Sequence, residues 1–137
     1  MFFGNKRSKP QNRIDSLIGA GTRIEGSVSF TGGLRVDGYI QGDIGEAGGQ
    51  ASTLVLSEDA RVEGVINVAH VVINGTVVGP VHAREYVELQ SKSRVTGDVF
   101  YNTLEMHIGA IVEGKLVHKE HVHEPDMTGE IPVVAGN

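Results

Sequence analysis

The stretch IEGSVSF at residues 24–30 contains an apolar residue, a glycine two positions later, and another apolar residue two positions after that. The same five-residue pattern returns as VDGYI, IQGDI, VEGVI, INGTV, VTGDV and VEGKL, beginning at residues 36, 40, 62, 73, 95 and 112. Alternation with a period of two places side chains on opposite faces of a β-strand. A helix would instead show apolar spacings of three and four. The pattern therefore predicts a chain of many short strands.

The glycines of this pattern set the length of a repeat. One glycine from each unit gives the series Gly26, Gly42, Gly64, Gly79, Gly97 and Gly114, with spacings of 16, 22, 15, 18 and 17 residues. The longest interval contains GEAGGQAS (45–52), which we interpret as an inserted loop. Three short strands joined by tight corners fill one coil of this period. The sequence thus predicts an all-β fold, a single β-helix of about six coils.

The sequence leaves two explanations for these glycines open. A corner requires a backbone conformation that glycine adopts cheaply, and a missing side chain also lets successive coils approach closely. A β-sandwich with glycine-rich turns is the alternative fold. It predicts Asn-Gly or Asp-Gly turns between strands, whereas here these dipeptides lie inside the apolar pattern.

Composition and charge narrow the classes of function. The chain has 137 residues, no cysteine and a net charge of −5, which argues against general nucleic-acid binding. It has no apolar run long enough for a membrane span and no signal-peptide pattern, so we expect a cytoplasmic protein. Residues 1–13 carry +4, from Lys6, Arg7, Lys9 and Arg13, so residues 14–137 sum to −9.

This asymmetry divides the chain into three segments. Residues 1–13 are expected to form a flexible basic and aromatic arm, and residues 14–117 the β-helix. Residues 118–137 are polar and contain Pro125 and Pro132, and we expect a disordered tail.

A β-helix leaves unpaired backbone groups and core side chains at each end, and solenoids usually cover such ends with a capping element. Neither terminal segment has the apolar spacing of a capping helix, so we predict end-to-end polymerisation. The expected N-terminal face comprises Leu17, Ile18 and Ile24. The expected C-terminal face comprises Leu104, Ile108, Val112 and Leu116, with Phe100 close by.

The stretch RIDSLIGAGTRIEGSV (13–28), the repeated VxGxV/I units and the MFF…K arm together resemble the bactofilin family. The resemblance covers about residues 13–117. It implies a right-handed triangular β-helix that assembles into non-polar filaments without nucleotide. It also implies a bacterial cytoskeletal scaffold, not an enzyme, that lies on the cytoplasmic membrane and recruits cell-wall synthesis or remodelling enzymes that help set cell shape.

The last coil departs from the pattern of that family. Bactofilins commonly read GAxFEG there, with the phenylalanine at the polymer contact, whereas this chain reads GAIVEG (109–114), with Val112 in its place. The sequence leaves open whether Val112 or Phe100 dominates the C-terminal contact.

The competing function is that of a hexapeptide acyltransferase, a trimeric enzyme with a left-handed β-helix. The segments IGAGTR (18–23), IEGSVS (24–29) and LSEDAR (56–61) fit its six-residue period. The period is lost between residues 30 and 52. Such an enzyme would also need a catalytic histidine and an extended loop or helix to form its pocket.

The histidines are the plausible catalytic or metal-binding residues. His70, His82 and His107 occur singly in the repeats, where an outward column is conceivable, but solvated strand positions are the commoner case. His118, His121 and His123 form HKEHVH, a weak transition-metal motif in the expected tail. There is no glycine-rich phosphate loop with a lysine. We therefore expect no catalytic residues, metal, cofactor or nucleotide.

The arm has the composition of a peripheral membrane anchor, and its expected targeting residues are Met1, Phe2, Phe3, Lys6, Arg7 and Lys9. Each cation near an anionic leaflet contributes about 1 kcal/mol. One arm therefore binds reversibly, and a filament that carries many arms binds by avidity. We expect the protein on the inner face of the cytoplasmic membrane, with itself, membrane lipids and cell-wall enzymes as partners.

Overall fold

The computed structural model describes residues 13–48 and 51–120, which form fifteen β-strands and no helix. None of the elements in this part of the chain is therefore a helix that could span a bilayer. The expected membrane-targeting residues Met1, Phe2, Phe3, Lys6, Arg7 and Lys9 lie outside the described residues, as do His121 and His123.

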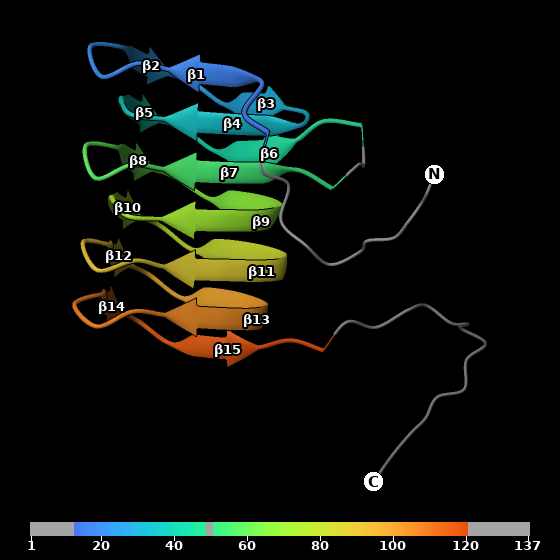
Figure 1. Cartoon of the computed structure of the whole chain (residues 1–137), viewed down its shortest axis with the longest axis vertical. Helices are drawn as coiled ribbons and strands as arrows, with labels where there is room; N and C mark the ends of the chain where they lie inside the picture. Colours follow the sequence, from blue (N-terminus) through green and yellow to red (C-terminus); the bar gives the residue numbers. More distant parts are fainter. Residues whose placement is uncertain (1–12, 49–50, 121–137) are drawn as a thin grey trace, which may run out of the picture.

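The strands stack into three flat faces, and every strand pairing is parallel (Figure 1). The first face contains β1 (Ser16–Ile18), β4 (Gly33–Val36), β7 (Thr53–Leu56) and the second halves of β9 (Ile66–Ile73), β11 (Val81–Leu89) and β13 (Val99–Met106). The second face contains β2 (Arg23–Glu25), β5 (Tyr39–Gln41), β8 (Arg61–Glu63), β10 (Thr76–Val78), β12 (Arg94–Thr96) and β14 (Ile111–Glu113). The third contains β3 (Val28–Phe30), β6 (Ile44–Glu46), the first halves of β9, β11 and β13, and β15 (Leu116–His118).

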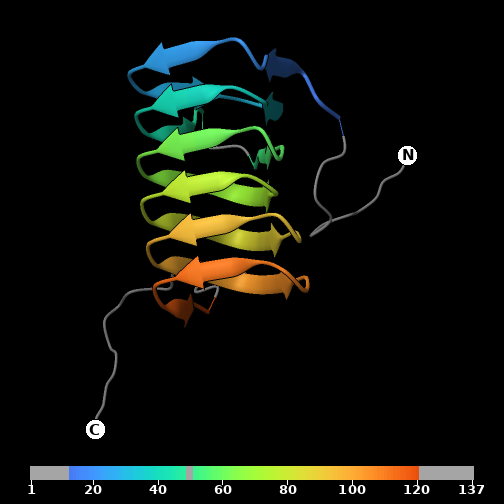
Figure 2. The same ribbon diagram turned by 90° about the vertical axis from the view of Figure 1, so that its left-hand side faces the viewer.

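These faces are the three sides of a triangular β-helix of six coils. The chain passes from β1 at the front of Figure 1 to β2 at the back and descends with each coil, so the coil is right-handed (Figures 1 and 2). The predicted fold class is confirmed. The all-parallel pairing rules out the β-sandwich, and the right-handed coil rules out the left-handed β-helix of the acyltransferases.

Alternation along each strand builds the core. Val and Ile suit pleated, half-buried positions, and every second one points inward. On the second face Ile40, Val62, Val77 and Val95 lie in successive coils in direct register, and each is 0% exposed. The core is thus a set of apolar columns that run the length of the rod.

The repeat glycines also form a column, at the corner between the second and third faces. A Cβ built on Gly97 would lie 2.5 Å from the carbonyl oxygen of Gly79, one coil earlier. Gly97 also has φ +141°, where L side chains are rare. At Gly97 both explanations left open by the sequence therefore hold. The corner needs a backbone conformation that favours glycine, and the missing side chain lets the coils approach closely.

The corner between the third and first faces differs from coil to coil. In the third to fifth coils the strand runs on through this corner, as β9, β11 and β13. Between the second and third coils the chain instead makes the connection between β6 and β7, where the sequence predicted a loop. The buried carboxylate of Glu46 lies here and accepts the backbone N–H groups of Ser52 at 3.0 Å and Ala69 at 2.6 Å.

Candidate functional site: the two ends of the β-helix

The first and last coils each leave one backbone edge open within the described part of the chain. Strands β1, β2 and β3 pair only with strands of the second coil. At the other end, β14, β15 and the second half of β13 pair only with strands of the fifth coil. Parallel strands direct backbone N–H and C=O groups along the rod axis, so each end presents a row of hydrogen-bonding groups around the core.

The C-terminal face consists of the inward side chains of the last coil, Leu104, Met106, Val112 and Leu116. The residues directly above them in the fifth coil, Val87, Leu89, Val95 and Val99, are all 0% exposed. Met106 and Leu116, by contrast, are 43% and 42% exposed. The apolar columns are therefore buried inside the rod and exposed to solvent at its end.

The N-terminal face has the same construction. Ile18, Ile24 and Val28 point inward in the first coil and are only partly buried, although they pack against the core. Their partners in the second coil are Val36, Ile40 and Ile44, which are at most 1% exposed. Both ends are thus apolar surfaces framed by open strand edges.

Three of the residues expected at the ends do not point into the core columns there. Leu17 lies in the first coil but points outward, above Arg35, and is 61% exposed. Ile108 lies at the tip of the corner after β13 and is 97% exposed. Phe100 lies in the fifth coil and pairs with Val117 of β15, so another strand separates it from the C-terminal face.

The ring of Phe100 contributes to a surface on the third face. It stacks on His82, with the ring centroids 4.5 Å apart, and Lys119 Nζ lies 5.3 Å from its centroid. Phe100 also lines a cavity of about 340 Å³ with Arg84 and Glu120. The ring of Phe100 therefore lies beside a cavity on the third face and not in an apolar column of the C-terminal face.

Sequence reasoning missed two inward residues of the end faces, Met106 and Val28. The signal for Met106 was available, because it follows Leu104 by two positions and so points to the same side of the strand. Val28 belongs to the same IEGSV unit as Ile24.

Polar groups fasten the terminal coils to their neighbours. At the N-terminal end, Asp15 accepts the backbone N–H of Gly33 at 2.8 Å and pairs with Arg13 at 2.9 Å. The hydrogen bond from Gly33, and after it the charge and hydrogen bond of Arg13, lower the pKa of Asp15. At the other end, Asp98 accepts the backbone N–H of Lys115 at 2.9 Å. These carboxylates hold the end coils in register.

The repeat histidines do not form one column. His70 is buried at the corner before the first face, with Nε2 3.3 Å from Glu85 Oε1, whereas His82 lies on the third face. His107 lies directly after β13 and contacts two carboxylates of the first face, those of Glu88 and Glu105. Of the tail histidines, His118 is described, at the end of β15 and 5.6 Å from the ring of Tyr101.

Comparison with known proteins gives the same fold. A family model described as "Bactofilin: Polymer-forming cytoskeletal" matches residues 16–117. Bactofilin BacP of Myxococcus xanthus (strain DK1622) is 26% identical over 116 residues, which are 85% of this chain and 47% of the relative. The chain thus spans about half the length of that curated relative. The atomic structure of the cytoskeletal bactofilin BacA from solid-state NMR matches with a TM-score of 0.67 at 32% identity, over 78% of this chain and 99% of that one.

Proposed function

The chain belongs to the bactofilin family of polymer-forming cytoskeletal proteins, and we propose that it polymerises end to end through the faces described above. The observation that carries this proposal is the change in exposure along one column, from 0% at Leu89 to 43% at Met106. A second subunit at this end would continue the column and pair the open strand edges. Fully burying one such side chain contributes roughly 1.5–3 kcal/mol.

Assembly in this mode requires no nucleotide. The contact joins apolar columns and backbone edges that are present in the folded chain itself, and the sequence has no phosphate-binding loop. A structural rather than a catalytic role fits the family. The filaments would be scaffolds, and a non-polar arrangement follows the family resemblance.

The test is sedimentation and negative-stain electron microscopy of the purified protein with and without ATP or GTP. Val112→Arg places a charge on the end face, where burial without a partner costs several kcal/mol. We expect it to leave short, folded units with a strand-rich circular dichroism spectrum. Equal yields of filaments with and without nucleotide are expected for the unmodified chain, and a strict nucleotide requirement would contradict the proposal.

Two matched variants locate the contact. Ile111→Arg changes the neighbouring residue of β14, which points outward and is 39% exposed, so filaments should persist. Phe100→Arg changes a ring that β15 separates from the end, so filaments should persist there also. Long filaments of Val112→Arg, or their loss in Phe100→Arg, would place the contact elsewhere.

We propose further that the arm, residues 1–13, binds the cytoplasmic membrane and that the filament recruits cell-wall synthesis or remodelling enzymes. The arm combines Phe2 and Phe3 with Lys6, Arg7 and Lys9, so one arm binds reversibly and the many arms of a filament bind by avidity. Deleting residues 2–9 removes no coil, so filaments should remain while co-sedimentation with anionic liposomes is lost. Equal liposome binding by both proteins would refute the role of the arm. The partner class rests on the family resemblance.

A further inference from the structure

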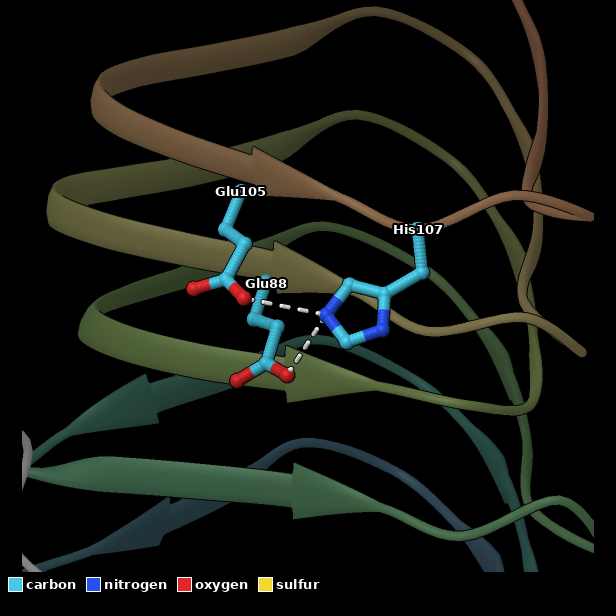
Figure 3. A group of neighbouring side chains, drawn as sticks. All are labelled: Glu88, Glu105 and His107. Atoms are coloured by element: carbon cyan, nitrogen blue, oxygen red, sulfur yellow. Dashed lines mark hydrogen bonds and ion pairs between the residues drawn. The ribbon is translucent and has the colours of Figure 1, made fainter.

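Glu88, Glu105 and His107 bring three potential metal ligands together on the outside of the last two coils (Figure 3). Nε2 of His107 lies 3.0 Å from Oε2 of Glu88 and 3.1 Å from Oε2 of Glu105. The three ligand atoms all lie within 4.8 Å of one another. The parallel register builds this arrangement, because Glu88 of β11 pairs directly with Glu105 of β13.

The spacing of these atoms suits a single small cation. Two ligands at about 2.1 Å from one Zn²⁺ lie about 3.0 Å apart at a right angle and about 3.4 Å apart at a tetrahedral angle. Both distances from the imidazole nitrogen are of this size. The side chain of Glu105 is 56% exposed, so it is free to bring its oxygen toward that of Glu88.

The hydroxyl of Tyr86 orients both carboxylates. It lies 3.2 Å from Oε1 of Glu88 and 2.9 Å from Oε1 of Glu105, while the Oε2 atom of each carboxylate faces His107. Gln90 Nε2 also donates to Glu88 Oε2 at 3.2 Å. Partners that fix the orientation of ligating carboxylates are a usual feature of metal sites.

The two negative charges of Glu88 and Glu105 also favour a bound cation. Like charges directly opposite each other on neighbouring strands destabilise a sheet. Among residues 13–48 and 51–120, only His107 forms an ion pair with either carboxylate. A divalent ion with a neutral imidazole would balance the two negative charges.

We propose that Glu88, Glu105 and His107 bind one divalent transition-metal ion of the Zn²⁺ class, with water completing its coordination. The imidazole nitrogen selects against Mg²⁺ and Ca²⁺, which prefer oxygen ligands. The ion joins β11 to the last coil through the outer surface, and it leaves the inward side chains of the C-terminal face free.

The test is equilibrium dialysis of the full chain against Zn²⁺ and, separately, Mg²⁺, followed by metal analysis. Because HKEHVH is itself a weak metal motif, the starting protein carries His118→Ala, His121→Ala and His123→Ala. We expect it to retain one Zn²⁺ per chain and no Mg²⁺. His107→Ala should lower the affinity at least tenfold, as should Glu88→Gln combined with Glu105→Gln. Co²⁺ should give the absorption bands of a protein-bound ion in the starting protein and lose them in both variants.

Glu113→Gln is the matched control, because it changes an outward carboxylate of the same coil and should leave Zn²⁺ binding unchanged. A strand-rich circular dichroism spectrum, recorded without metal, shows that each variant is folded. The proposal is overturned if zinc is lost with the tail histidines, if His107→Ala binds it unchanged, or if Mg²⁺ binds equally. The first result would leave His107 as a hydrogen-bonding partner of the two carboxylates only.

Discussion

Gly97 meets two separate requirements for glycine, a positive φ and a close approach of the neighbouring coil. It has a positive φ of +141°, and a Cβ there would meet the backbone of the coil above. Gly26 occupies the same column in the first coil, with φ +138° but with no atom within 4 Å of a Cβ. Gly21 shows no such contact within 4 Å and no positive φ. The three glycines therefore allow backbone strain and steric overlap to be measured apart.

Alanine at these positions should give a graded series of stabilities. Gly26→Ala should lower the free energy of unfolding by about 1–3 kcal/mol, the usual cost of a strained backbone. Gly97→Ala should cost more, because the strands must also separate. Gly21→Ala should be neutral or slightly stabilising. Urea unfolding followed by circular dichroism measures the series, and equal losses at positions 26 and 97 would show that close approach contributes nothing.

Asp15 should make the first coil sensitive to acid. Its pKa in the folded chain lies below the ordinary 3.8, first because of the Gly33 N–H and then because of Arg13. The unfolded chain therefore binds the proton more readily. The stabilisation is present above about pH 4 and is lost as the pH falls through the lowered pKa.

Comparison with Asp15→Ala isolates this contribution. The difference in free energy of unfolding between the unmodified chain and the variant should be largest near pH 7 and should shrink between pH 4 and pH 2. Urea titrations at several pH values give this difference directly. A difference that stays constant down to pH 2 would mean that the pKa of Asp15 is the same in the folded and the unfolded chain.

The strands show where sequence reasoning succeeds and where it stops. The glycine period predicted six coils because each corner glycine is required by the backbone, whatever the side chains nearby. It could not place Leu17, because SLIG offers two successive apolar residues and the register alone decides which one points inward. Ile108 is 97% exposed for a similar reason, since the corner that follows β13 interrupts the alternation.

Glu46 holds together the corner where the coil is interrupted. Its side chain is 4% exposed and pairs with Arg84 at 2.8 Å, in addition to accepting the N–H groups of Ser52 and Ala69. Nothing in the sequence predicts this arrangement, because a glutamate beside a glycine-rich loop normally faces solvent. The carboxylate is an acceptor for backbone groups at the point where the strand ladder is interrupted.

Removing this carboxylate should destabilise the second and third coils. Glu46→Ala leaves the buried N–H of Ala69 without its acceptor, which alone costs about 1–3 kcal/mol. Glu46→Gln keeps an oxygen that accepts hydrogen bonds and should recover part of the loss. Unfolding midpoints in urea compare the two. If both variants have the same unfolding midpoint in urea as the unmodified chain, Glu46 does not stabilise the corner.

The two ends of the rod make filament polarity accessible to a simple mass measurement. In a non-polar filament each end meets the same end of another subunit, so two kinds of junction alternate. Blocking the C-terminal face with Val112→Arg would then leave the N-terminal junction intact, and the product should be a dimer. In a head-to-tail filament every junction needs one face of each kind, and the same variant should be a monomer.

Size-exclusion chromatography with light scattering separates these outcomes. We expect Val112→Arg to give twice the 14.6 kDa of one chain. Ile24→Arg should also give a dimer, through the other junction, and the variant with both changes should give a monomer. Monomers from either single variant would contradict the non-polar arrangement.

The uncovered coil at each end also governs how such filaments grow. In the non-polar arrangement, a subunit that covers one kind of end face exposes its other end face, so growth in single file neither consumes nor creates any other surface. Each kind of junction then has a fixed free energy, whatever the length already reached. We expect a population assembled in this way to elongate without a lag and without a threshold concentration, with a mean length that rises smoothly with the amount of protein. In the assembly proposed above the rod itself would supply no nucleation step, so we expect control over where and when filaments form to act on supply, on severing or through the membrane arm.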